Sequence, residues 1–266
     1  DAFATYAANY AEGQPGRAYR SVEDTTHDPI INSRAPLPYS SLSRSEDYYV
    51  EGALVWLEAD QIIREGTNGA KGLDDFAKAF FGVRDGDWGE LPYDFDEVVS
   101  TLNGVYPYDW ATFLTTRLYG VNQPAPLRGL NMAGYKLVWK EEPNSYDKGR
   151  MGGYNYTSLT YSLGVNLTDN GTVSSTLWDG PAFDAGLVDG SQILAVNGTA
   201  YSKEAIMDAI TAAKGTKDPI ELMVKRGDAY RTVKIDYHGG LRYPYLEKTG
   251  EGEQGLDRLL APRTGG

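Results

Sequence analysis

The sequence predicts an α+β protein, in which a mainly α-helical part is followed by a part built from short strands. Three observations support this. Within the first 120 residues, apolar residues recur at helical spacing between capped starts and glycine stops. Prolines and glycines then interrupt the chain at 121–129 and 141–158. From about residue 159, short alternating segments separated by turns replace the helical pattern.

The helical part starts with a turn-rich segment and then contains one long helix. Residues 1–46 are rich in turn signals, with a short helix expected over 2–11. The clearest helix is expected over 47–64, because apolar residues there are spaced to bury a broad face. Ser43 and Glu46 have the Ser-x-x-Glu spacing of a capping box that would start this helix.

Shorter helices and one strand complete the helical part. Asp94 is the expected N-cap of the helix predicted over 95–102, and Glu97 stands three residues later. The alternation at 135–139 is typical of a strand. The shorter helices are expected over residues 73–81, 95–102 and 109–119.

The strand-rich part has a capped helix and a closing hairpin. Ser202 is placed to cap a helix whose apolar residues lie on one face. Segments 220–225 and 230–237 alternate around a turn and indicate a hairpin. We therefore predict a helical domain over 1–140, a linker over 141–158, a strand domain over 159–240 and a tail over 241–266.

Composition excludes several classes of function. The net charge is −12 without clusters of Lys and Arg, which argues against nucleic-acid binding. No apolar run approaches the ~18 residues of a membrane span, so no membrane partner is expected. The absence of Cys excludes thiol catalysis and disulfides.

The chain begins at Asp1 without Met, so we expect a processed or truncated chain. Its tyrosine-rich composition is common in secreted and periplasmic hydrolases, but the compartment stays open.

The segment 48–54, Tyr-Tyr-Val-Glu-Gly-Ala-Leu, carries a family resemblance. It resembles the Tyr-Tyr-x-x-Gly-Ala-Leu segment of the glycyl aminopeptidase family, whose members are zinc metallopeptidases with a PDZ domain near the C-terminus. The resemblance covers nearly the whole chain. It also includes Pro-Gly-Arg at 15–17, Leu-Asp-Asp-Phe at 73–76 and Tyr-Asp-Trp at 108–110.

The strand-rich part resembles a PDZ domain, which implies a β-sandwich or barrel. Residues 162–167 are similar to the carboxylate-binding loop of PDZ domains and the strand that follows it. Residues 180–198 are similar to a helix of bacterial PDZ domains and to the strand and turn after that helix. Such a domain binds an extended peptide or C-terminus at a sheet edge. Alternatively, the protein itself covers that edge. The groove residues implied by the resemblance are Leu163, Gly164, Val165, Ile206 and Ile210.

The same resemblance implies catalytic roles near the start of the long helix. The implied reaction removes a small N-terminal residue, such as Gly or Ala, from a peptide substrate. Tyr49 would stabilise the oxyanion that forms in this reaction. If the alignment with the family segment is shifted by one residue, Tyr48 takes this role. Glu46 and Glu51 could bind the free α-amine of the substrate. Position alone instead favours a buried aromatic at Tyr49 and helix-stabilising acids in the first turn.

The zinc ligands of the family are missing from this chain. It contains no His-Glu-x-x-His, and His27 and His238 lack ligand spacing. We therefore expect a C-terminal fragment that holds no metal and no cofactor itself, with zinc bound by the full-length parent and the missing N-terminal half as a partner. The alternative is a non-catalytic peptide-binding adaptor, in which the PDZ-like domain is the functional part.

Overall fold

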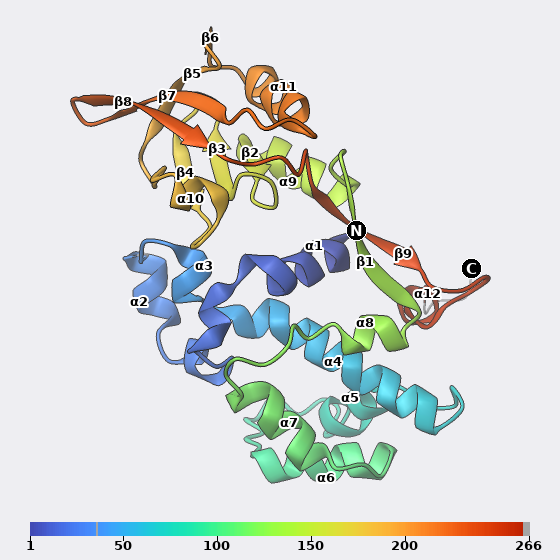
Figure 1. Cartoon of the computed structure of the whole chain (residues 1–266). Helices are drawn as coiled ribbons and strands as arrows, with labels where there is room; N and C mark the ends of the chain where they lie inside the picture. The colour runs from blue at the N-terminus through green and yellow to red at the C-terminus, as the bar shows by residue number, and fades with distance from the viewer. Residues whose placement is uncertain (36, 263–266) are drawn as a thin grey trace. The chain divides into compact units, whose positions relative to one another are not determined.

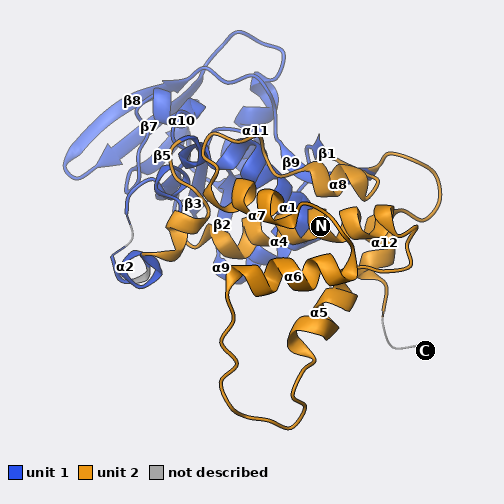
Figure 2. Ribbon diagram, turned by 90° about the horizontal axis from the view of Figure 1, so that it is seen from below, with its two compact units in different colours: residues 1–18, 28–45, 137–247 blue, residues 19–27, 46–136, 248–266 orange. Residues whose placement is uncertain are grey.

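The computed structural model describes residues 1–35 and 37–262, which form two compact units (Figure 2). Unit 1 contains residues 1–18, 28–45 and 137–247. Unit 2 contains residues 19–27 and 46–136 and the segment from 248 onward. Each unit is assembled from three separate stretches of the chain, so neither corresponds to one continuous segment.

Unit 1 combines strands with short helices (Figure 1). Its helical elements are α1 (Ala2–Ala8), η1 (Asn9–Gly13), η2 (Pro15–Ala18), α2 (Pro29–Arg34), α3 (Ser40–Ser43), α9 (Ser145–Tyr154), α10 (Pro181–Asp184) and α11 (Lys203–Ala213). Its strands are β2 (Tyr156–Leu159), β3 (Val165–Thr168), β4 (Val173–Thr176), β5 (Gln192–Val196), β6 (Thr199–Ala200), β7 (Ile220–Arg226) and β8 (Ala229–Ile235). The strands β1 (Tyr135–Lys140) and β9 (Tyr243–Lys248) lie mostly in this unit.

The described strands of the chain form three sheets, and none of the three closes into a barrel. One sheet has the order β2-β3-β4, a second has the order β6-β5-β7-β8, and β1 pairs with β9 in the third. All pairings within the first two sheets are antiparallel. Aliphatic side chains from these strands and from α11 form one buried core. The barrel alternative of the predicted fold is therefore not formed by the described residues.

Unit 2 is helical and has its own core. Helix α4 (Asp47–Gly66) packs against α5 (Leu73–Phe81) and α8 (Arg128–Met132), α5 packs against α6 (Phe95–Val105), and α6 against α7 (Trp110–Tyr119). A short 3-10 helix, η3 (Glu23–Thr26), contacts α4 and α7, and α12 (Gly255–Leu260) lies near the C-terminus. The core is rich in aromatic residues, with Phe76, Trp110 and Phe113 among its buried members.

Most of the predicted elements are present at the expected places. Helices α4 and α5 begin at the predicted residues. At the start of α6, the Asp94 carboxylate accepts from the Glu97 backbone N–H at 2.9 Å, and Glu97 Oε2 accepts from the Asp94 N–H at 3.1 Å. The predicted capping box at this helix is thus confirmed. Ser202 likewise caps α11, accepting from the Ala205 N–H at 3.0 Å.

Two predictions of local structure are wrong. The segment 141–158 is not an irregular linker, because it contains helix α9 and most of strand β2. Asn144 starts this helix by accepting from the Asp147 N–H at 2.9 Å, which compensates for the low helix propensity of its glycines. The capping box expected at Ser43 does not start α4, because Ser43 ends α3 and Glu46 adopts a left-handed conformation with φ 52°.

No described helix is both long enough and apolar enough to cross a membrane.

Candidate functional site

The first turn of α4 presents Tyr49 to solvent. Its side chain is 69% exposed, which excludes the buried aromatic that position alone favoured. Its backbone N–H donates to the Glu46 carbonyl at 3.2 Å, so Tyr49 belongs to the first turn of a 20-residue helix. A phenol on a rigid helix that is open to solvent can donate a hydrogen bond to a bound ligand.

Tyr48 and Glu46 flank this phenol. The Tyr48 and Tyr49 rings lie 4.7 Å apart between centroids and are tilted by 36°. Desolvation raises the pKa of Tyr48, and the neighbouring Tyr49 and Glu46 raise it further. Glu46 is exposed at the N-cap of α4, and its charge acts on Tyr48. The two tyrosine hydroxyls and one carboxylate therefore form a compact polar group.

Glu51 does not join this group. Two residues along a helix correspond to a rotation of about 200°, which directs Glu51 away from the face of Tyr49. Its side chain is 3% exposed and lies in the interior of unit 2. Of the two carboxylates predicted to bind a substrate amine, the structure brings only Glu46 beside Tyr49.

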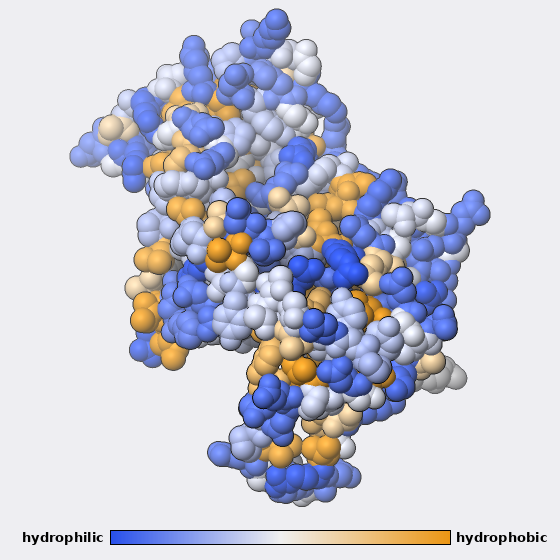
Figure 3. Space-filling model, turned by 60° about the horizontal axis from the view of Figure 1, so that its bottom comes forward, coloured by the Kyte–Doolittle hydropathy of each residue, from blue (hydrophilic) through white to orange (hydrophobic). Residues whose placement is uncertain are grey.

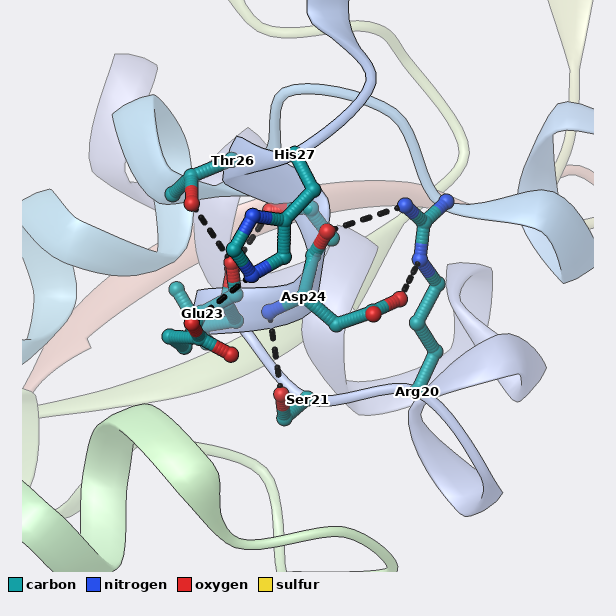
Figure 4. Close-up of polar contacts among 8 residues, drawn as sticks. Arg20, Ser21, Glu23, Asp24, Thr26 and His27 are labelled. Carbon is teal, nitrogen blue, oxygen red and sulfur yellow. Dashed lines mark hydrogen bonds and ion pairs between the residues drawn. The ribbon is translucent and has the colours of Figure 1, made fainter.

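The two histidines lie in different units and have carboxylate partners. The His27 ring is within 2.8 Å of Glu23 Oε1, on the turn drawn in Figure 4. On the same turn, Arg20 pairs with Asp24, whose backbone N–H donates to Ser21 Oγ at 3.1 Å (Figure 4). His238 lies in unit 1, beside Asp236. Within the described residues, no three His, Cys, Asp or Glu side chains converge in a way that could hold a metal ion.

The structure also shows a buried ion cluster in unit 2 that sequence analysis missed. Glu58 on α4 is completely buried, and its carboxylate accepts from two guanidinium groups. Arg117 Nη2 donates to both oxygens at 2.8 Å, and Arg128 Nη1 donates to Oε1 at 2.8 Å. The hydrogen bond to Glu58 is the main reason why the pKa of Arg128 is raised.

This cluster borders a pocket of about 220 Å³ that is also lined by Tyr108, Thr112 and Thr116. The backbone of α8 reaches α4 there because residue 129 is glycine: a Cβ at this position would lie 2.6 Å from the Glu58 nitrogen. A glutamate on the apolar face of a helix was the only sequence signal for the cluster. Nothing in the sequence pattern identified its arginine partners, which lie 59 and 70 residues away.

A second hollow in unit 2 has a volume of about 520 Å³ and is lined by parts of the segment 79–101. The chain between α5 and α6 exposes several large apolar residues, among them Trp88, which is 98% exposed. In the space-filling view, apolar residues form several separate groups within a mostly hydrophilic surface (Figure 3).

The predicted groove residues of the strand-rich part lie in its core. Leu163, Val165, Ile206 and Ile210 are all buried, and Gly164 adopts φ 82° in the turn before β3. Their side chains form part of one aliphatic cluster. The structure thus brings these residues together, as expected of a loop, strand and helix that share a core.

Comparisons with known proteins give a similarity of fold. No protein-family model matches the sequence, and comparison with curated proteins gives no significant match. The chain is similar to the crystal structure of an aminopeptidase N family protein from Idiomarina loihiensis, with 18% identity and a TM-score of 0.62. The match covers 96% of this chain and 43% of that one, so this chain spans less than half the length of that protein.

A second similar structure is the PDZ domain of HtrA3 bound to a phage-derived ligand. It is 16% identical with a TM-score of 0.23, over 43% of this chain and 91% of that domain. A TM-score of this size does not establish a shared fold. The first similarity shows that this chain has the fold of part of an aminopeptidase N family protein.

Proposed function

We propose that this chain is the C-terminal part of a zinc aminopeptidase of the glycyl aminopeptidase type, which removes small N-terminal residues from peptides. The shared fold over 96% of the chain with an aminopeptidase N family protein supports this proposal. The segment at 48–54 resembles the Tyr-Tyr-x-x-Gly-Ala-Leu segment of the glycyl aminopeptidase family, which supports the narrower proposal. The strand-rich part would be PDZ-like and serve peptide or intramolecular contacts.

The observation that carries the catalytic proposal is the exposed phenol of Tyr49. A hydroxyl fixed at the first turn of a helix can donate to the substrate carbonyl oxygen as negative charge develops on it. Such a donor binds the transition state more strongly than the ground state, so it raises kcat. Glu46 is the exposed carboxylate at the N-cap of the same helix and is proposed to bind the substrate amine.

The described residues do not fit a catalytic zinc. Such a site needs three protein ligands and an open position, and no group of three suitable side chains is present in the described part of the chain. Zinc is therefore proposed to be held by residues of the parent protein outside this chain.

The test is Tyr49→Phe in the complete protein that contains this chain, with kcat and KM measured on Gly and Ala anilides. The phenyl ring preserves packing and removes only the hydroxyl. Loss of an oxyanion donor is expected to lower kcat by about 10²–10³, with a much smaller change in KM.

Tyr48→Phe is the matched control, since it removes the neighbouring hydroxyl from the same turn. A collapsed rate in Tyr48→Phe with a normal rate in Tyr49→Phe would move the role by one residue. Rates within a few-fold of wild type in both variants would exclude the two hydroxyls from the mechanism.

A further inference from the structure

Strand β3 of unit 1 has no free edge. It pairs antiparallel with β4 on one side and with β2 on the other. The pairing with β2 is continuous over four residues, from Tyr156↔Thr168 to Leu159↔Val165. β3 is the strand that follows the proposed carboxylate-binding loop, and strand addition in PDZ domains takes place on such a sheet edge.

The direction and register of β2 are those expected of a peptide ligand. β2 runs antiparallel to β3, and its C-terminal residue, Leu159, lies beside the loop, opposite Val165. The Leu159 carbonyl accepts from the backbone N–H groups of Ser162 at 3.1 Å and Gly164 at 3.0 Å. Backbone N–H groups of such a loop are the donors that would otherwise hold a terminal carboxylate.

The side chains of β2 also occupy buried positions. Leu159 is part of the aliphatic core that contains Leu163, Ile206 and Ile210, and Thr157 is buried as well. Residues i and i+2 of a strand lie on the same face, so Thr157 and Leu159 both point inward. β2 thus fills both the hydrogen-bonding edge and part of the apolar core.

The outer edge of β2 is covered by helix α9, which packs against it. The Ser158 N–H is directed to the sulfur of Met151 on α9, at 3.3 Å. In an antiparallel strand, successive N–H groups point to opposite sides. The N–H groups of Thr157 and Leu159 are therefore those that face β3.

We propose that β2 is a built-in ligand of the PDZ-like part: residues 156–159 occupy the strand edge and the carboxylate loop, so the folded chain does not take an external C-terminal peptide at β3. This inference rests on the PDZ-like assignment within the proposed function. It selects an intramolecular contact over a peptide from another protein, and it is independent of the peptidase reaction.

The experiment uses a labelled peptide with the sequence of β2, Tyr-Thr-Ser-Leu, ending in a free carboxylate, and the same peptide with an amidated end. The wild-type chain is expected to show no saturable binding up to about 1 mM of either. Thr157→Pro removes an N–H that faces β3 and weakens the β2–β3 pairing. This variant is expected to bind the free-carboxylate peptide at least about tenfold more tightly than the amide.

Ser158→Pro is the matched control. It places proline where the N–H faces away from β3, which an edge strand tolerates, so no gain of peptide binding is expected. A folded Thr157→Pro variant that binds neither peptide would overturn the proposal. So would a wild-type chain that binds the peptide with new protection of amides 163–168 against hydrogen exchange.

Hydrogen exchange of the wild-type chain tests the proposal even if Thr157→Pro does not fold. The N–H groups of Ser162 and Gly164 are expected to exchange as slowly as those of β7, because the Leu159 carbonyl holds them. Exchange at the rate of an open loop would show that β2 leaves the edge readily and would contradict the proposal. All these readouts concern binding and exchange, so a failed peptidase assignment would leave them unchanged.

Discussion

The two units differ in the carboxylates that they bury. The main core of unit 1 is aliphatic, and its buried polar groups include the Arg44 side chain and Tyr243, whose pKa is raised to about 12 by burial. In unit 2, four carboxylates are buried on the single helix α4. Two of them, Glu58 and Asp60, are paired with arginines. Unit 1 is therefore stabilised mainly by apolar burial and strand pairing, whereas unit 2 also depends on charge pairs buried beside an aromatic core.

The largest expected effect is in the aliphatic core of unit 1. Leu222→Ala removes a completely buried side chain from β7 and leaves a cavity. The free energy of unfolding is expected to fall by about 3 kcal/mol. Hydrogen exchange should show the loss of protection in β7 and β8, while amides of α4 change little.

Met223→Ala is the control for this substitution. Its side chain is 50% exposed on the other face of the same strand, so the change should be within about 0.5 kcal/mol. Equal destabilisation by both substitutions would contradict the assigned register of β7.

A smaller effect is expected from the buried charge of unit 2. Glu58→Gln keeps the shape but replaces a carboxylate that accepts from two guanidinium groups. The arginines are partly exposed, so water compensates in part, and we expect a loss of about 2 kcal/mol in the free energy of unfolding. The loss should appear as faster exchange in α4 and α7.

Glu65→Gln on the same helix is the control, because this glutamate is exposed. Its effect should be within about 0.5 kcal/mol. If Glu58→Gln were equally neutral, the buried cluster would not contribute to the stability of unit 2.

The same contrast explains which features could be predicted from the sequence. The long helix α4, the capped helix α6 and the alternating strand β7 follow from local periodicity and capping residues, which the chain displays directly. Helix α9 was missed because its glycines and the preceding proline indicate a loop, while the Asn144 cap and the burial of Met151 stabilise a helix. Local propensity was outweighed there by a cap and by packing.

The candidate sites depended on contacts that local pattern does not contain. The family resemblance suggested Tyr49, and closeness in the sequence suggested Glu46 and Glu51 as its partners, but the Glu51 side chain is buried. The partners of Glu58 and the pairing of β2 with β3 are set by tertiary structure. A single sequence shows which residues are polar or apolar, but not which distant residue completes a pair.

The smallest expected effect is a pH dependence that differs between the units. In unit 2, the pKa of Asp257 is lowered by hydrogen bonds from Lys248, from Tyr135 and from the Gln254 N–H. A carboxylate with a lowered pKa stabilises the fold above its unfolded pKa of about 3.9, and this stabilisation is lost as pH falls through the folded pKa. Asp257 therefore contributes no change between pH 6 and 8.

In unit 1, the pKa of His238 is raised by the hydrogen bond to the Ala213 carbonyl and by Asp236 and Asp218. The ring nitrogens lie 3.0 Å from that carbonyl and 2.7 Å from Asp236 Oδ1, and only the imidazolium can donate to both acceptors at once. A raised folded pKa gives stability that is complete below the unfolded pKa of about 6.5 and is lost as pH rises through the folded value. Exchange in β8 is therefore expected to accelerate slightly more between pH 6 and 8 than the intrinsic amide rate requires, and His238→Asn should abolish this excess. An excess of the same size in α4, or one that persists in His238→Asn, would show that the pH dependence does not arise from this histidine.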